Sequence, residues 1–174
     1  MSGLTSAPPA PLGPGDHVRG PPSGLAVIVF GDYECPFCAA LEPRLAALPL
    51  RLAFRHFPVR AGHPRAFAAA CAAEAAAAQG AFWSIHDALM ADQARLEDPH
   101  LWARAQALGL DLERFDADRR GDVVAERVRA SFRNAIRAGV VTTPTLLVDG
   151  VLHPGRPGPE LRARLGMPDG PPAS

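Results

Sequence analysis

The fold class is indicated most clearly by the segment Leu25-Ala-Val-Ile-Val-Phe-Gly-Asp-Tyr-Glu-Cys-Pro-Phe-Cys38. Its first six residues form an unbroken apolar run rich in β-branched side chains, which predicts a central strand covered on both faces. Residues 35–48 follow with Leu41, Leu45 and Leu48 at helical spacing, and Pro43 should kink this helix. A buried strand that leads into Cys-x-x-Cys at the start of a helix is typical of redox-active cysteines.

The rest of the chain predicts further strands and helices. Residues 52–57 read as a second strand ended by Pro58. Residues 145–148 and 151–153 read as two strands joined by a tight Asp149-Gly150 turn. Between these strands, residues from about 64 to 138 have only helical patterns. The helices are expected at 66–79, 82–90, 98–109, a short stretch after Asp111, 122–139 and, after the hairpin, 159–165. This order predicts an α/β fold with an all-helical insertion.

Length and composition narrow the class of protein. The chain has 174 residues and a formal net charge of zero, and all its basic residues are Arg, so no broad positive field indicates a nucleic-acid or membrane partner. Residues 1–23 are rich in Pro, Gly and Ser and predict a flexible segment without a secretory signal or membrane span. We expect the folded domain at 24–166, a frayed tail at 167–174 and a cytoplasmic location.

The chemistry centres on Cys35-Pro36-Phe37-Cys38. Unpaired amides at a helix N-terminus lower a thiol pKa from about 8.5 into the range ~3.5–7.5, which makes Cys35 the expected nucleophile. Cys38 lies one turn deeper and is the expected resolving thiol, while Pro36 suits the first helical turn. No bound cofactor is required, because the thiols themselves carry the electrons.

The cysteine pair has two other possible interpretations. A structural zinc ion needs four ligands, and only Cys71 and six scattered His remain, so no metal site is expected. An inactive pair is the other alternative. The position between a strand and a helix favours redox use over both.

Five blocks of the sequence resemble the DsbA-like branch of the thioredoxin superfamily. Within it, the chain looks closest to short bacterial members related to soluble domains fused to some sodium/proton antiporters. The similarity covers about residues 15–153. The blocks are Asp16–Pro21, Phe30–Cys38, Phe54–Pro58, Gln79–Asp87 and Val141–Thr145, of which the second and last are the most specific.

This resemblance implies a thioredoxin-like core capped by the helical insertion at about 64–138. It also implies that Pro144 is a cis-proline facing the sulfurs and that Thr143 offers its backbone to an extended substrate segment. Pro36 and Phe37 belong to the same substrate-binding surface. The implied partners are protein or small-molecule thiols and disulfides, together with a redox recycling partner.

The sequence departs from many relatives around the cysteines. Val29 stands where relatives carry a buried acid that exchanges a proton with the resolving Cys, and Asp32 is the nearest replacement. Phe37 cannot donate a hydrogen bond to the thiolate, and Glu34 adds a negative charge. We therefore expect a Cys35 less acidic than in strong oxidants. The expected reduction potential lies in the more reducing half of the range from about −120 to about −270 mV.

The expected function is thiol–disulfide exchange with cytosolic protein or small-thiol substrates. One alternative is a non-catalytic partner-binding or regulatory module on the same scaffold, and another is a glutathione-conjugating or isomerising enzyme. Cys71 is expected to be a buried small hydrophobe. His56 and His86 are interpreted as packing residues. Trp83 and Trp102 are expected in the core of the insertion, with a position along a substrate groove as the alternative.

Overall fold

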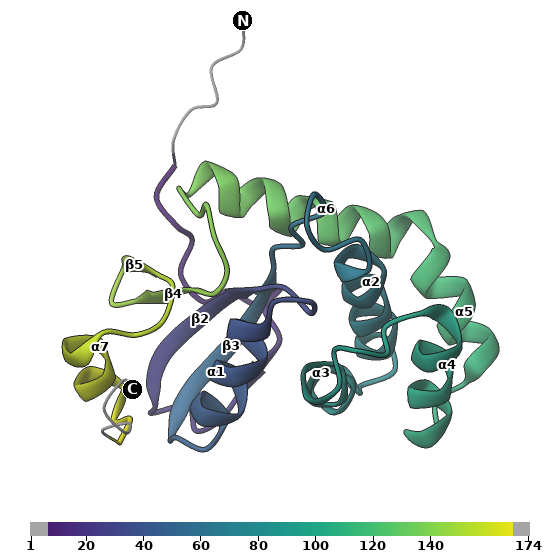
Figure 1. Cartoon of the computed structure of the whole chain (residues 1–174), viewed down its shortest axis with the longest axis horizontal. Coiled ribbons are helices and arrows are strands. Elements are labelled where there is room, and N and C mark those ends of the chain that lie inside the picture. The colour runs from purple at the N-terminus through teal and green to yellow at the C-terminus, as the bar shows by residue number, and fades with distance from the viewer. Residues whose placement is uncertain (1–6, 169–174) are drawn as a thin grey trace, which may run out of the picture.

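The sheet is built around strand β2 (Leu25–Gly31), as Figure 1 shows for the computed structural model, which describes residues 7–168. Five strands follow the order β1-β3-β2-β4-β5. Their bounds are β1 Val18–Arg19, β3 Leu50–His56, β4 Thr145–Val148 and β5 Val151–Pro154. Strands β2 and β3 pair in parallel, and the other neighbours pair antiparallel. The result is a mixed sheet within the α/β fold that the sequence predicts.

Strand β2 is apolar throughout because both of its faces are covered. Val27 and Val29 belong to one core cluster, and Ile28 and Phe30 belong to a second cluster on the opposite face. This alternation follows from the period of two in a strand. The first cluster includes the buried face of α1, and the second includes Ala135 of α6.

Helix α1 (Pro36–Ala46) and helix α6 (Asp122–Arg137) therefore lie on opposite faces of the sheet. Helices α2 to α5 form a separate bundle beside the sheet, and α6 runs from this bundle across to it (Figure 1). This bundle is the predicted all-helical insertion. The remaining helices are α2 Ala66–Ala77, α3 Phe82–Ala91, α4 Asp98–Ala107, α5 Leu112–Arg120 and α7 Pro159–Leu165.

The structure differs from the sequence-based expectations at several points. Helix α1 ends at Ala46 instead of residue 48, because Pro49 disfavours a helical conformation at Leu48. Trp102 is 42% exposed, so its assignment to the insertion core is wrong. Strand β1 was not predicted, because its two residues lie within the Pro- and Gly-rich segment and carry no strand pattern of their own.

Residues 7–23 make specific contacts with the folded domain. Strand β1 pairs with β3, and the Asp16 carboxylate forms an ion pair with Arg55 at 2.8 Å. The sequence predicts residues 1–23 as a flexible segment. These contacts place residues 7–23 of that segment against the sheet. Residues 1–6 of that segment and residues 169–174 of the predicted tail lie outside the described residues. Across residues 7–168, no helix has both the length and the apolar character needed to cross a membrane.

Candidate active site

The cysteine pair lies at the beginning of α1. Cys35 is the N-cap residue, with an extended backbone, and Pro36 occupies the first helical position, where a missing N–H costs little. Cys38 is fully buried and Cys35 is only 3% exposed. Phe37 is 48% exposed, and the guanidinium of Arg156 lies over its ring at 4.9 Å. Pro36 and Phe37 are thus the residues of the motif that face solvent.

The two thiols have opposite acidities. A hydrogen bond from the Cys38 thiol lowers the pKa of Cys35 to about 5 against the effect of burial, and the amides of Cys38 and Phe37 add to this stabilisation. The same hydrogen bond, together with burial, raises the pKa of Cys38 well above its usual value. At neutral pH Cys35 is therefore a thiolate and Cys38 a protonated thiol. This is the order of reactivity that a nucleophile and a resolving thiol require.

Thr143 lies directly against the nucleophile. The Cys35 sulfur is 3.5 Å from the main-chain oxygen of Thr143. The Thr143–Pro144 peptide bond is cis, as the family resemblance implies, and Pro144 is buried behind it. The Thr145 hydroxyl donates to the Thr142 carbonyl at 2.7 Å and ties the two ends of this loop together. Cys35, Cys38 and Thr143 thus come together in space.

Asp32 anchors the loop between β2 and α1. Its carboxylate accepts hydrogen bonds from the amides of Glu34 and Val59, each at 2.7 Å, and contacts Nδ1 of His63 at 2.8 Å. Its main-chain N–H donates to the sulfur of Cys38. Asp32 is the nearest replacement for the acid that many relatives carry at the position of Val29. In this structure its carboxylate holds the loop between β2 and α1.

Glu34 faces the insertion instead of the thiolate. Its carboxylate accepts hydrogen bonds from the amides of Arg65 and Ala66 at 2.6 and 2.7 Å. These are unpaired donors at the N-terminus of α2, where a negative charge is favourable. The expectation that Glu34 opposes the Cys35 thiolate did not include the pairing of its carboxylate with these two amides.

Gln93 also supports the site, although no pattern in the sequence singled it out. Its side-chain amide donates to the carbonyls of Tyr33 and Cys35 at 2.8 and 2.9 Å. The segment between α3 and α4 thereby holds the backbone on both sides of Glu34. No local pattern marks Gln93, since its partners lie 58 and 60 residues earlier.

Two buried carboxylates lie between the sheet and the insertion. Glu42 shares the buried face of α1 with Cys38, one turn farther along, and contacts Nε2 of His86 at 3.2 Å. The other ring nitrogen of His86 lies 3.0 Å from the hydroxyl of Tyr33. An acid inside the apolar stripe of α1 was the signal available in the sequence. The two buried glutamates, Glu42 and Glu74, therefore come from helices α1 and α2 and not from strand β2.

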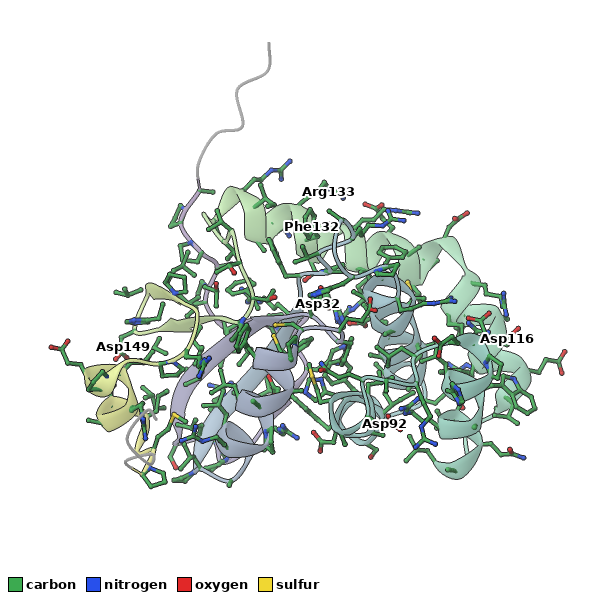
Figure 2. The ribbon with its side chains drawn as sticks, in the orientation of Figure 1. Asp32, Asp92, Asp116, Phe132, Arg133 and Asp149 are labelled. Atoms are coloured by element: carbon green, nitrogen blue, oxygen red, sulfur yellow. The ribbon has the colours of Figure 1, made fainter. Side chains whose placement is uncertain are left out.

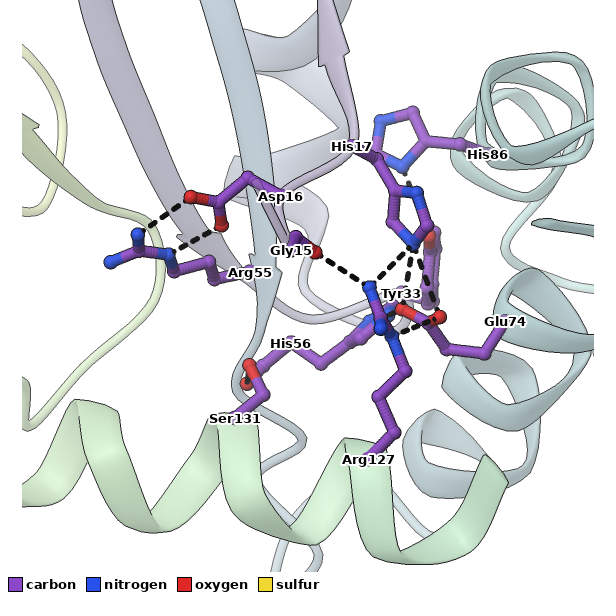
Figure 3. Close-up of polar contacts among 10 residues, drawn as sticks. All are labelled: Gly15, Asp16, His17, Tyr33, Arg55, His56, Glu74, His86, Arg127 and Ser131. Carbon is purple, nitrogen blue, oxygen red and sulfur yellow. Dashed lines mark hydrogen bonds and ion pairs between the residues drawn. The ribbon is translucent and has the colours of Figure 1, made fainter. Parts of the chain in front are cut away.

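Glu74 forms the second cluster, shown in Figure 3. Its carboxylate contacts His17 at 3.1 Å, His56 at 2.8 Å and Arg127 at 2.5 Å. Burial lowers the pKa of His56, so a neutral imidazole faces the carboxylate. His56 and His86 are both buried against neighbouring aromatic rings, which agrees with their interpretation as packing residues.

Cys71 lies apart from this chemistry. It is 3% exposed on α2 and unpaired, as the sequence predicts. Burial raises the pKa of Cys71 to about 11, which keeps it protonated and unreactive at neutral pH.

Comparison with known proteins identifies the family. The model of the DSBA-like thioredoxin domain matches residues 26–165, so the chain belongs to this family. Among curated relatives, Na(+)/H(+) antiporter NhaA 1 of Salinispora arenicola is 44% identical over an alignment of 149 residues that covers 80% of this chain. Na(+)/H(+) antiporter NhaA of Herminiimonas arsenicoxydans is 40% identical over an alignment of 142 residues that covers 78% of this chain. The chain spans 22% of the length of each of these two relatives.

Solved structures confirm the thioredoxin-like fold. A thioredoxin-like oxidoreductase from Silicibacter pomeroyi superposes with a TM-score of 0.77 at 28% identity, covering 88% of this chain and 91% of that one. The thiol-disulfide exchange protein alpha-DsbA2 from Wolbachia pipientis gives a TM-score of 0.75 at 20% identity, covering 87% and 86%.

Proposed function

We propose that this protein is a thiol–disulfide oxidoreductase in which Cys35 exchanges disulfides and Cys38 resolves the intermediate. The observation that carries the proposal is the position of the Cys35 sulfur. It lies at the N-terminus of α1, hydrogen-bonded to Cys38 and 3.5 Å from the Thr143 carbonyl. Membership of the DsbA-like family supports the same class of reaction.

In the reducing direction, the Cys35 thiolate attacks one sulfur of a substrate disulfide. A Cys35–substrate bond forms while the substrate disulfide breaks, and the second substrate sulfur leaves as a thiolate that takes up a proton. Cys38 then loses its proton and attacks the Cys35 sulfur. The Cys35–Cys38 disulfide forms, the substrate leaves as its second thiol, and the substrate has gained two electrons. The oxidising direction reverses these steps.

Substrate binding in this proposal uses the backbone beside the sulfurs. An extended substrate segment lies along residues 141–143 as an added strand, which brings its cysteine to Cys35. The exposed surface of Pro36 and the ring of Phe37 form the opposite wall. Substrates are protein or small-molecule disulfides and thiols, and a separate redox partner restores the starting state of the cysteine pair.

Reduction of insulin disulfides tests the proposal. The wild-type protein should turn over with a dithiol reductant present, and Cys35→Ser should abolish turnover. Cys38→Ala should accumulate a mixed disulfide through Cys35, because no thiol remains to resolve it. A partner complex that forms equally well with both cysteines replaced, together with no turnover, would instead support a non-catalytic binding module.

A further inference from the structure

An apolar groove lies beside the candidate active site, between α6 and the segment that follows β3. Its volume is about 530 Å³. Aromatic and aliphatic side chains from both elements line it, chiefly Phe57, Phe67, Val128, Phe132, Ile136 and Val141. The rings of Phe57 and Phe132 pack together at 4.7 Å between centroids. Such a surface binds bulky apolar groups.

Two of the lining residues connect this groove to the site. Val59 donates its amide to Asp32, which lies three residues before Cys35. Val141 lies two residues before Thr143 and is 81% exposed. In Figure 2 Phe132 lies on α6 toward the top of the view, and Asp32 lies below it, nearer the centre of the molecule. A chain that runs along Thr143 toward Val141 therefore reaches the groove within a few residues, at about 3.3 Å per residue.

The groove is positively charged. Arg60, Arg129 and Arg133 line it, and no Asp or Glu does. The guanidinium groups of Arg60 and Arg129 lie over the ring of Phe67 at 4.8 and 5.6 Å. Within residues 7–168 neither of these two forms an ion pair, whereas Arg133 pairs with Glu126. A guanidinium stacked on a ring keeps its N–H edge available for a carboxylate.

We propose that this groove binds the polypeptide next to the reactive cysteine and selects substrates with a carboxylate beside a bulky apolar side chain. The inference rests on the proposed exchange reaction and specifies its substrate class. The apolar side chain fills the groove between Phe57 and Phe132. The carboxylate pairs with Arg60 and Arg129, whose positive field also speeds the encounter.

The test compares three synthetic peptides that contain the same disulfide. One carries Glu-Phe near the reactive cysteine, the second Gln-Phe and the third Lys-Phe, each prepared with the pair on either side of the cysteine. We expect kcat/KM for the best Glu-Phe peptide to exceed that of its Gln-Phe counterpart by about tenfold at low salt. The preference should shrink as the ionic strength rises from about 0.01 M to about 1 M.

Variants locate the effect. Arg60→Gln and Arg129→Gln should each reduce the preference for glutamate, while the rate with the Gln-Phe peptide changes little. Arg51→Gln is the matched control, because Arg51 is exposed at the opposite end of β3. Unfolding midpoints should confirm that all three variants are folded. Equal rates for the three peptides, or an unchanged preference in both groove variants, would overturn the inference.

An uncharged small disulfide separates this inference from the proposed function. Exchange with 2-hydroxyethyl disulfide should be the same in the wild type and in the three arginine variants. No exchange with this reagent would contradict the oxidoreductase function itself. A concentration-dependent dimer that Arg60→Gln dissociates would show that a second copy of the chain occupies the groove, which also contradicts the inference.

Discussion

The sulfur of Cys35 lies 3.5 Å from the main-chain oxygen of Thr143, 108 residues farther along the chain. The sheet register creates this contact. Strands β2 and β4 pair antiparallel with Phe30 opposite Thr145. The chain that leaves β2 toward Cys35 and the chain that enters β4 from Thr143 therefore meet at the same end of these two neighbouring strands. In the sequence, the whole helical insertion lies between them.

The first prediction concerns the acidity of Cys35. Alkylation of the reduced protein by iodoacetamide should follow a titration with its midpoint near pH 5, since the Cys38 thiol and two amides stabilise the thiolate. Cys38 and Cys71 should react much more slowly at pH 7, because the pKa of each is raised. Mass spectrometry of quenched samples identifies the labelled residue. Labelling of Cys38 before Cys35 would contradict the assignment of roles.

Glu34 provides the second prediction. In Glu34→Gln the charge at the N-terminus of α2 is lost, and we expect the free energy of unfolding to fall by about 1 kcal/mol. The pKa of Cys35 should stay near 5, because the carboxylate points to Arg65 and Ala66. A marked fall in the pKa of Cys35 would show that Glu34 opposes the thiolate after all. Urea unfolding and thiolate absorbance measure the two quantities.

The central part of the fold could be predicted from local patterns. The apolar run of β2, the cysteines at the start of α1 and the Asp149-Gly150 turn each determine structure over a few neighbouring residues. Strand β1 carries no such pattern, because it is two residues long and gains its order from pairing with β3. Its stability depends on the completed sheet.

The supporting contacts of the site could not be predicted for a related reason. Three supporting residues contact partners that lie 31 to 60 residues away in the sequence, namely Asp32, Glu34 and Gln93. Some of these partners are backbone amides, which any residue could supply. Glu42 was detectable as an acid on the buried face of α1, yet its partner His86 comes from the insertion. Sequence patterns locate the reactive groups, whereas three-dimensional contacts determine their acidity.

His63 provides a prediction about pH. Its contact with the Asp32 carboxylate raises the pKa of His63, although burial acts in the opposite direction. A raised pKa in the folded state means that the contact stabilises the protein fully below the unfolded value of about 6.5. This contribution disappears as the pH rises through the folded pKa.

We therefore expect His63→Ala to lower the free energy of unfolding more at pH 5.5 than at pH 8.5. The comparison should be repeated in a Cys35→Ser background, so that titration of the nearby thiolate does not contribute. A destabilisation that is the same at both pH values would contradict an ionised Asp32–His63 contact.

Cys71 should be dispensable for exchange. Cys71→Ala removes one buried sulfur atom from α2, and we expect a loss of about 1 kcal/mol in unfolding free energy with insulin reduction unchanged. Denaturant unfolding and turnover measure the two effects. A disulfide between Cys71 and Cys35 or Cys38, identified by mass spectrometry, would show that the third cysteine takes part.

Equilibration with defined glutathione mixtures shows whether Cys35 and Cys38 form a reversible two-electron redox pair. The pKa of Cys35 is about 5, which is below the pKa of about 7 of the reactive cysteine in thioredoxin. The Cys35 thiolate is therefore the more stable of the two thiolates. We predict a single transition between about −120 and about −270 mV, on the oxidising side of thioredoxin. Thiols that never pair across this range would contradict a redox role for Cys35 and Cys38, and a potential below that of thioredoxin would contradict a thiolate of this stability.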